Sequence, residues 1–160
     1  MGEIQPYFVK AIFWRPPDCL RGMAPLVWLP PGGCHVVPDL DRAARFYETV
    51  LSLQALLKLD RLYAYDVGGS NVLLVFRRGG SREAMVSPGG TIPPHDGSGP
   101  IHVCFAVNTE DLPEWEARLA ELDIPIEGRV TWPPGGKSVY FRDPDGHMLE
   151  LMTPGTWQIY

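Results

Sequence analysis

An internal repeat is the feature that most constrains the fold of this chain. Residues 34–76 and 101–152 each have the pattern of a strand, a helix and three further strands, because apolar side chains recur first with a strand period and then with a helix period. Asp39 and Asp111 stand at the expected starts of the two helices. We therefore predict an α+β fold in which two βαβββ modules form a curved mixed β-sheet. The helices would cover its convex face and a ligand cavity would lie on the concave face.

The repeat divides the 160 residues into segments. We expect an N-terminal arm at 1–31, a first module at 32–77, an inter-module loop at 78–100, a second module at 101–153 and a C-terminal tail at 154–160. The arm contains several prolines, which forbid long regular elements, yet it is rich in aromatic side chains. It is expected either to lie across the domain or a partner subunit, or to form a disordered extension.

Composition excludes several functional classes. The apolar content of 45 % and the charged content of 21 % are typical of a soluble globular protein. The net charge is −5 and no basic patch is present, which argues against nucleic acid as a partner. No apolar run is long enough to span a membrane. Three cysteines are an odd number at spacings that do not suit a metal site, so reduced thiols in a cytoplasmic protein are expected.

One carboxylate interrupts the apolar strand expected at residues 147–152. Strand alternation places Glu150 on the same face as Met148 and Met152. A carboxylate among such side chains costs free energy unless it is paired, solvated in a cavity or bound to a metal. The preceding residues 143–146, Asp-Pro-Asp-Gly, have the composition of a tight turn.

Two stretches resemble a known family. Residues 39–47 have the sequence Asp-Leu-Asp-Arg-Ala-Ala-Arg-Phe-Tyr, and residues 140–151 have the sequence Tyr-Phe-Arg-Asp-Pro-Asp-Gly-His-Met-Leu-Glu-Leu. Together with the duplicated topology, they resemble the vicinal oxygen chelate superfamily over roughly residues 33–154. That superfamily contains glyoxalases, fosfomycin-resistance enzymes, ring-cleaving dioxygenases, epimerases and metal-free bleomycin-resistance proteins. The resemblance implies a divalent metal held by residues on the first and last strands of each module, but not which reaction is catalysed.

In the second module, the resemblance implies two metal ligands, His102 on the first strand and Glu150 on the last. Strand parity agrees, because His102 shares a face with the small side chains of Cys104 and Ala106. A histidine and a carboxylate together suit Zn, Fe, Mn, Ni or Co without choosing among them. The alternatives are a neutral strand histidine bonded to backbone, and a Glu150 paired with a nearby arginine or lysine.

The first module departs from this pattern. A ligand on its first strand is expected seven residues before Asp39, where the chain has Gly32, which has no side chain to bind a metal. Cys34 has the same strand parity and His35 the opposite one, so a β-bulge would be needed to turn His35 inward. With His35 the site would hold two histidines and one carboxylate, the arrangement of non-haem iron sites. On the last strand of this module, leucines occupy the positions where a carboxylate could stand.

Four other side chains are candidates for substrate binding. Arg142 and Tyr140 share strand parity and are expected to face the cavity, where Arg142 would bind a carboxylate or phosphonate. Trp132 opens the Pro- and Gly-rich segment 132–137, which is expected to be a mobile loop over the site. Tyr65 would supply an aromatic wall. Residues of these types are more often found in the core or on the surface than in a binding site.

The resemblance implies a metal-dependent, glyoxalase-like enzyme of the lyase or isomerase type. The metal would bind two adjacent oxygens of a small-molecule substrate, and Glu150 or a metal-bound water would move a proton. A metal-free protein that sequesters an antibiotic-like small molecule, resembling bleomycin-resistance proteins, is the alternative favoured by Gly32. A ring-cleaving dioxygenase is favoured if His35 completes the site. A homodimer is expected in either case, since the family often builds or covers its clefts with a second subunit.

Overall fold

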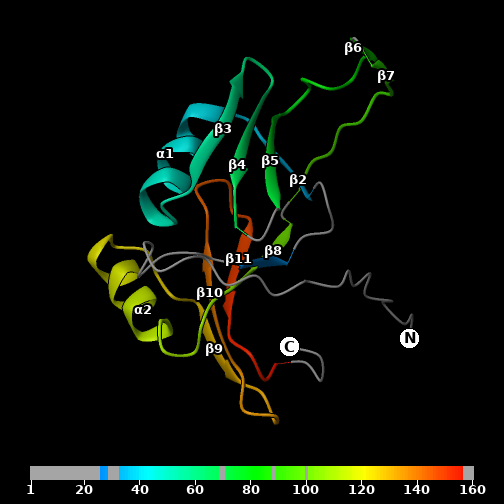
Figure 1. The fold of residues 1–160 in the computed structure, drawn as a ribbon. Helices are drawn as coiled ribbons and strands as arrows, with labels where there is room; N and C mark the ends of the chain where they lie inside the picture. The colour runs from blue at the N-terminus through cyan, green and yellow to red at the C-terminus, as the bar shows by residue number, and fades with distance from the viewer. Residues whose placement is uncertain (1–25, 29–32, 69–70, 88, 100, 157–160) are drawn as a thin grey trace, which may run out of the picture.

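The computed structural model of the chain describes residues 26–28, 33–68, 71–87, 89–99 and 101–156. Gly32 and most of the expected N-terminal arm lie outside these residues. Within them the chain forms two helices and eleven strands, labelled in Figure 1. Neither of these helices is long and apolar enough to cross a lipid bilayer.

The first module runs from β2 to β5 in the expected order. Its elements are β2 (Gly33–Val37), α1 (Leu40–Val50), β3 (Gln54–Leu59), β4 (Leu62–Asp66) and β5 (Val72–Arg77). The helix begins where the sequence predicted, because the Asp39 carboxylate accepts a hydrogen bond from the Arg42 backbone N–H at 3.0 Å and caps the first turn.

The second module repeats this order from β8 to β11. Its elements are β8 (His102–Ala106), α2 (Leu112–Glu121), β9 (Gly128–Thr131), β10 (Lys137–Arg142) and β11 (Met148–Met152). Strand β9 begins at Gly128, and residues 122–127 before it form no strand. Ile124 and Ile126 pack against the core instead, and Pro125 between them has no N–H to offer a strand ladder.

Hydrogen bonds divide the strands of the two modules into two mixed sheets. One has the order β2-β5-β4-β3 and the other β1-β8-β11-β10-β9, where β1 (Leu26–Trp28) comes from the expected arm and pairs antiparallel with β8. In each module the first and last strands are parallel neighbours, and the remaining pairs are antiparallel. The α+β class and the two βαβββ modules are therefore confirmed.

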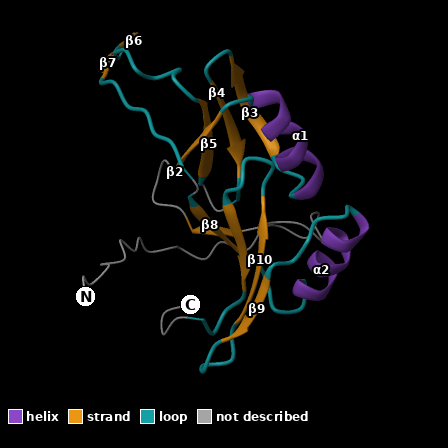
Figure 2. Cartoon of the chain, turned by 180° about the vertical axis from the view of Figure 1, so that it is seen from behind, coloured by secondary structure: helices purple, strands orange, loops and turns teal. Residues whose placement is uncertain are grey.

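Both helices lie on the same side of the sheets, as Figures 1 and 2 show from opposite directions. A large apolar cluster joins α1 and α2 to both sheets, and it includes Phe105 of β8, Phe141 of β10 and Leu149 of β11. Residues of the opposite parity in these three strands therefore lie on the face turned away from α2. That open face is where the sequence predicted a site.

Polar side chains also join the two modules. Arg118 of α2 donates hydrogen bonds to the carbonyl oxygens of Thr49 and Val50 at 2.6 and 2.8 Å. These carbonyls end α1 and have no partner within the helix, so a cation there is stabilising. Arg42 of α1 forms an ion pair with Asp145 in the turn between β10 and β11.

The inter-module loop contains a hairpin that the Gly- and Ser-rich sequence did not predict. Strands β6 (Met85–Ser87) and β7 (Gly90–Ile92) pair antiparallel and extend away from both modules (Figure 1). The base of this segment is held by the Asp96 carboxylate, which accepts from the Arg82 guanidinium at 3.0 Å and from the Gly79 N–H at 3.2 Å. Strands this short carry too little alternation to be recognised.

Candidate functional site

His102 and Glu150 come together on the open face of the five-stranded sheet. In the strand registers, Glu150 of β11 lies between Tyr140 of β10 and Cys104 of β8. His102 precedes Cys104 by two residues and shares its face. The His102 Nε2 atom is 3.1 Å from Glu150 Oε2, so the two side chains that the sequence singled out are in direct contact.

Glu150 is a buried carboxylate with several polar partners. Its side chain is 8 % exposed and that of His102 is 52 % exposed, so the pair opens to solvent on the histidine side. The Tyr140 hydroxyl donates to Glu150 Oε1 at 2.9 Å. Ser138 also hydrogen-bonds to the carboxylate, and its Oγ accepts from Trp132 Nε1 at 2.8 Å. These bonds offset the cost of burying the charge.

The surroundings of Glu150 keep it ionised. Burial raises the pKa of Glu150, but hydrogen bonds from His102, Ser138 and Tyr140 favour the carboxylate and leave that pKa below its ordinary value. Burial and the bond to Glu150 raise the pKa of Tyr140 to about 12. Burial and the same carboxylate raise the pKa of the Cys104 thiol. At neutral pH the site therefore presents one carboxylate beside a neutral phenol and a neutral thiol.

Trp132, which the sequence predicted at the start of a mobile loop over the site, lies in the turn between β9 and β10. The Trp132 N–H donates to Gly136 O at 2.8 Å, and the Gly136 N–H donates to Gly155 O at 3.0 Å. A Cβ atom at Gly136 would lie 2.3 Å from the Thr156 nitrogen, so this close approach requires glycine. The turn is thereby joined to the segment that follows β11.

The other two predicted substrate-binding residues have different surroundings. Arg142 shares a face with Tyr140, but its guanidinium already donates to the Glu127 carboxylate at 3.1 Å. Tyr65 does not reach this face, because alternate residues of β4 point toward α1 and Tyr65 is one of them. It is fully buried in the core, where its hydroxyl donates to Glu48 at 3.2 Å.

His35 lies in a second polar cluster, apart from the pair on the open face. Its Nδ1 atom is 2.8 Å from the Tyr47 hydroxyl, which donates to Oδ2 of Asp143 at 2.8 Å. The β-bulge that would have turned His35 toward the open face is not present, because β2 pairs with β5 in regular register. Strand alternation therefore directs the His35 side chain to the helix side of the sheet, where it is fully buried.

His147 completes this buried cluster. Its ring centroid is 5.0 Å from that of His35, and its Nδ1 atom accepts a hydrogen bond from the Ile101 N–H at 3.2 Å. Within the described residues, neither His35 Nε2 nor His147 Nε2 has a hydrogen-bond partner, although both atoms are buried. One ligand atom from each of His35, Asp143 and His147 lies within 4.8 Å of the others, so the group could hold a metal ion.

Burial sets the protonation of this cluster. Burial, and to a smaller extent the neighbouring His147, lowers the pKa of His35 to about 3, so the ring is neutral near pH 7. Burial and Asp143 raise the pKa of Tyr47. Because the Tyr47 hydroxyl donates to Asp143, it accepts from His35 Nδ1–H, and the free electron pair of His35 is on Nε2.

Sequence reasoning did not identify Tyr47, Asp143 and His147 as members of a polar cluster. Tyr47 fits the apolar stripe of a helix, and Asp143 fits turn chemistry, so each has a sufficient local explanation. The available signal was His35 itself. A histidine at a core-facing position of a strand requires polar partners from the elements that pack on it.

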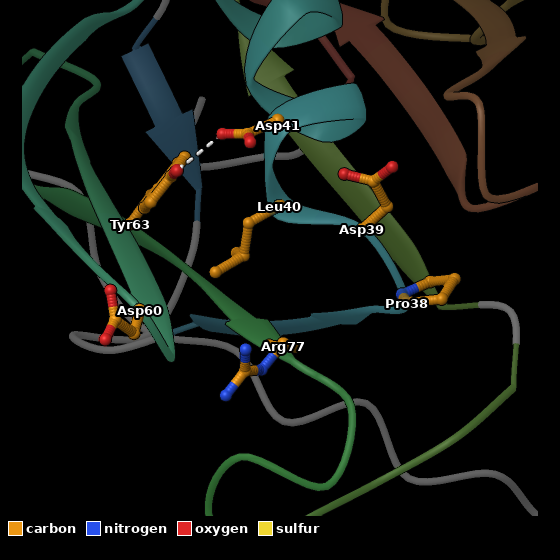
Figure 3. A pocket seen from close by; sticks show the side chains of 7 residues that line it. All are labelled: Pro38, Asp39, Leu40, Asp41, Asp60, Tyr63 and Arg77. Atoms are coloured by element: carbon orange, nitrogen blue, oxygen red, sulfur yellow. Dashed lines mark hydrogen bonds between the residues drawn. The ribbon is translucent and has the colours of Figure 1, made fainter.

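A surface pocket lies at the N-terminal end of α1, as Figure 3 shows. It has a volume of about 490 Å³ and is lined by Pro38, Asp39, Leu40, Asp41, Asp60, Tyr63 and Arg77. The Tyr63 hydroxyl donates to Asp41 at 2.6 Å across its wall. None of the predicted metal ligands or substrate-binding residues lines this pocket, so it is separate from both polar clusters.

Comparison with known sequences identifies relatives of the chain. Residues 34–151 match the family model described as the Glyoxalase/Bleomycin resistance protein/Dioxygenase superfamily. The metallothiol transferase FosB of Bacillus licheniformis is 31 % identical over 118 residues, which cover 73 % of this chain and 70 % of the relative.

Comparison with solved structures supports the same fold. The crystal structure of lactoylglutathione lyase from Agrobacterium tumefaciens superposes with a TM-score of 0.72 at 32 % identity, over 90 % of this chain and 99 % of that one. The fosfomycin resistance protein FosX from Mesorhizobium loti superposes with a TM-score of 0.52 at 24 % identity, over 78 % of this chain and 90 % of that one. The likeness to FosX shows the fold alone.

Proposed function

The chain belongs to the glyoxalase/bleomycin resistance protein/dioxygenase superfamily, and from this premise we propose that it is a metal-dependent, glyoxalase-like enzyme of the lyase or isomerase type. Its substrate would be a small molecule that chelates a divalent metal through two adjacent oxygens. Two relatives are named as enzymes, one a transferase and one a lyase, and this supports an enzyme over a binding protein.

The observation that carries the proposal is the 3.1 Å approach of His102 Nε2 to Glu150 Oε2. An imidazole nitrogen and an ionised carboxylate are ligands that suit Zn, Fe, Mn, Ni or Co. The exposure of His102 gives an ion and a substrate access to both atoms. The donor set and its access therefore fit a catalytic metal, which in such a site polarises the bound oxygens of a substrate as a Lewis acid.

In this proposal the surrounding hydroxyls orient the Glu150 carboxylate. Tyr140 donates to Oε1 and leaves Oε2 on the side of His102. Ser138 fixes the carboxylate from a position that is almost fully buried, and Trp132 holds Ser138. A ligating carboxylate keeps its orientation only while such partners are in place. Glu150 is also our candidate for the group that accepts and returns a substrate proton.

We propose that Arg142 binds an anionic group of the substrate. It lies on the same face as Tyr140. Its guanidinium donates to the Gly146 carbonyl oxygen at 2.8 Å, and its other partner, Glu127, is an exposed carboxylate that a substrate anion could replace. Exposed ion pairs of this kind contribute little to stability, so the exchange costs little.

Two protein ligands alone would bind a divalent metal weakly. We propose that a second copy of the chain supplies a further ligand in a homodimer, since His35, the third ligand considered from the sequence, lies in the buried cluster. A cytoplasmic location is part of the same proposal. Cys104 is a free thiol and is the only cysteine whose side chain lies within the described residues, which suits a reducing compartment.

Metal binding by single variants tests this function. We expect His102→Ala and Glu150→Gln to weaken Mn²⁺ or Zn²⁺ binding at this site by about 100-fold or more, since loss of an outer-shell partner alone typically costs 10–100-fold. The matched control is His95→Ala, which removes a histidine that packs against Phe76 outside the site. Calorimetric titration measures the affinity. If His102→Ala and His95→Ala bind the metal equally well, the site is not the one proposed.

A chelating probe distinguishes the enzyme from its alternative. Oxalate offers two adjacent oxygens, and we expect it to bind the metal-loaded parent but not Glu150→Gln. The sequestering alternative is favoured by the apolar first module, where Leu62, Ala64 and Phe76 form a cluster of their own. That alternative would be supported if the protein bound an apolar drug with an affinity that neither metal removal nor the substitutions of His102 and Glu150 changed. The dioxygenase alternative was favoured if His35 completed the site, and the contact of His35 with Tyr47 in the buried cluster does not support it.

A further inference from the structure

We propose that His35, Asp143 and His147 form a second metal site, which binds Zn²⁺ or a similar divalent ion and joins the two modules. His35 comes from β2 of the first module, and the other two come from the turn between β10 and β11 of the second. Two imidazoles and one carboxylate form a donor set typical of Zn²⁺, Fe²⁺ or Co²⁺. This site shares no residue with the proposed catalytic pair.

The strongest observation is that His35 already has the surroundings of a metal ligand. Its Nδ1–H donates to Tyr47, which donates to Asp143, and this chain of bonds fixes both the tautomer and the ring orientation. Metal-bound histidines are oriented by such bonds through the second ring nitrogen. The His35 Nε2 atom carries the free electron pair, is buried, and has no partner among the described residues.

Asp143 can bind an ion without losing its present bonds. Its Oδ1 atom accepts from the backbone N–H groups of Asp145 and His147 at 2.9 and 2.8 Å, and its Oδ2 atom accepts from Tyr47. Each carboxylate oxygen has two acceptor directions, so one remains on Oδ2. Ligand atoms that surround Zn²⁺ at about 2.0–2.2 Å lie about 3–4 Å apart. The present separations of up to 4.8 Å require only small side-chain rotations.

Metal binding by His147 should be detectable through one backbone amide, that of Ile101. Its Nδ1 atom accepts from the Ile101 N–H, so in the metal-free protein the ring proton is on Nε2. Coordination through Nε2 moves that proton to Nδ1, which can then no longer accept from Ile101. Ile101 is 37 % exposed and lies just before β8, so its amide can turn to solvent. Metal binding at His147 is therefore coupled to release of the Ile101 amide.

The burial of the cluster indicates a structural metal. His35, Asp143 and His147 are 0, 5 and 3 % exposed, which leaves no access for a substrate. Three protein ligands leave the fourth position of a tetrahedral Zn²⁺ for one water molecule, and the free energy of binding adds to the free energy of folding. The ion would thus hold the first strand of one module against the last turn of the other.

Metal stoichiometry tests the site without any substrate. We expect the full chain, stripped with EDTA and then titrated with Co²⁺, to take up one ion per chain that His102→Ala does not remove. His147→Gln and His35→Gln should remove that ion, and His95→Gln should keep it. A Tyr47→Phe variant should bind it about 10–100-fold more weakly, because the bond that orients His35 is lost. Loss of all Co²⁺ uptake in His102→Ala would overturn the proposal.

Hydrogen exchange gives a readout that needs no variant. On saturation with Zn²⁺, we expect exchange of the Ile101 amide to become at least tenfold faster. The Met148 amide, which donates to Ile101 O at 2.8 Å, is the matched control and should not change. Zn²⁺ that binds without changing Ile101 exchange is not coordinated by His147, and the proposal fails. Failure of the catalytic site is separate, since it appears as metal uptake that His102→Ala leaves unchanged.

Discussion

The two modules share a topology but carry opposite chemistry on the same face. In the second module Tyr140 of β10 is aligned with Glu150 of β11, and in the first module Ala64 of β4 is aligned with Leu74 of β5. The position that Glu150 occupies in the second module is thus occupied by Leu74 in the first. Packing of helix and sheet constrains only the core-facing side chains, so the open face of each copy was free to diverge.

The core-facing sides of the two modules differ as well. By the same alignment, His35 in β2 corresponds to Phe105 in β8, and both side chains are fully buried. Phe105 packs in the apolar cluster, whereas His35 requires Tyr47 and Asp143 as partners. Each module therefore has one polar group where its counterpart has an apolar one. The polar group is on the open face in the second module and on the buried face in the first.

Exchanging the aligned residues of the open faces should have the largest effect. We expect Glu150→Leu to abolish metal binding at His102 while the protein stays folded, because leucine is what the first module carries at the aligned position. The reverse change, Leu74→Glu, places a carboxylate beside Ala64 without hydroxyl donors. It should lower the free energy of unfolding by about 1–3 kcal/mol, the cost of burying an unpaired polar group.

Calorimetric titration and urea unfolding of the two variants measure these effects. A Leu74→Met variant is the control for a change of shape without charge and should be nearly neutral. If Leu74→Glu is as stable as the parent and gains metal affinity, the first module can also form a metal site. The open faces of the two modules would then not differ in chemistry as described above.

Exchanging the aligned residues of the buried faces should remove a pH dependence. The pKa of His35 is about 3 in the folded state and near 6.5 when unfolded, so between these values the unfolded state binds more protons. Metal-free protein should therefore be most stable above pH 6.5 and lose up to about 1.4 kcal/mol per pH unit as the pH falls toward 3. His35→Phe, which copies the second module, should flatten this slope.

Urea unfolding in EDTA between pH 5 and 6.5 isolates the histidine contribution. The lowered pKa of Glu150 also adds stability that is lost as pH falls, but only below its ordinary value of 4.5. His95→Phe is the control and should keep the parent slope. An unchanged slope in His35→Phe would mean that His35 is not held neutral by its burial.

The sequence predicted the open face better than the buried one, and the reason is physical. The resemblance implied His102 and Glu150, and strand alternation supported both positions, because the period of two is geometric. The same rule placed His35 on the helix side unless a bulge intervened, and no bulge is present. The sequence does not show which residues, far apart in the chain, become neighbours in the fold. Tyr47 and Asp143 are 96 residues apart, and only the packing of α1 against the β10–β11 turn brings them together.

The geometry of the turn between β9 and β10 could not be predicted from the local sequence either. Pro- and Gly-rich residues 132–137 were predicted to form a mobile loop over the site, since such composition marks turns and loops alike. The observed turn depends on the contact between Gly136 and the backbone of Gly155. These two residues are too far apart in the chain for a local sequence pattern to predict their contact. The N-cap at Asp39, by contrast, involves residues three apart and was predictable.

Removing the hydroxyl that joins the buried cluster should also lower the stability of the protein. Tyr47→Phe leaves Asp143 Oδ2 and His35 Nδ1 without their partner, which should cost about 1–3 kcal/mol of unfolding free energy. Tyr65→Phe is the matched control, since among the described residues its hydroxyl bonds only to the half-buried Glu48 of the first module, and it should cost less than about 1 kcal/mol. Equal costs would mean that the buried network contributes no more than an ordinary hydroxyl.

The smallest expected effect concerns how the helices of the two modules are joined. The last turn of α1 contains no basic residue, whereas α2 carries Arg118 in its own last turn and uses it to bind the carbonyls of Thr49 and Val50. Arg118→Met keeps the apolar stem but removes the cation from the end of α1, and should cost about 1 kcal/mol of unfolding free energy. Arg129→Met breaks only an exposed pair with Glu116 and should cost about 0–0.5 kcal/mol. The difference between the two variants in urea unfolding measures what α2 contributes to α1, and equal costs would mean that the modules are joined by their apolar core alone.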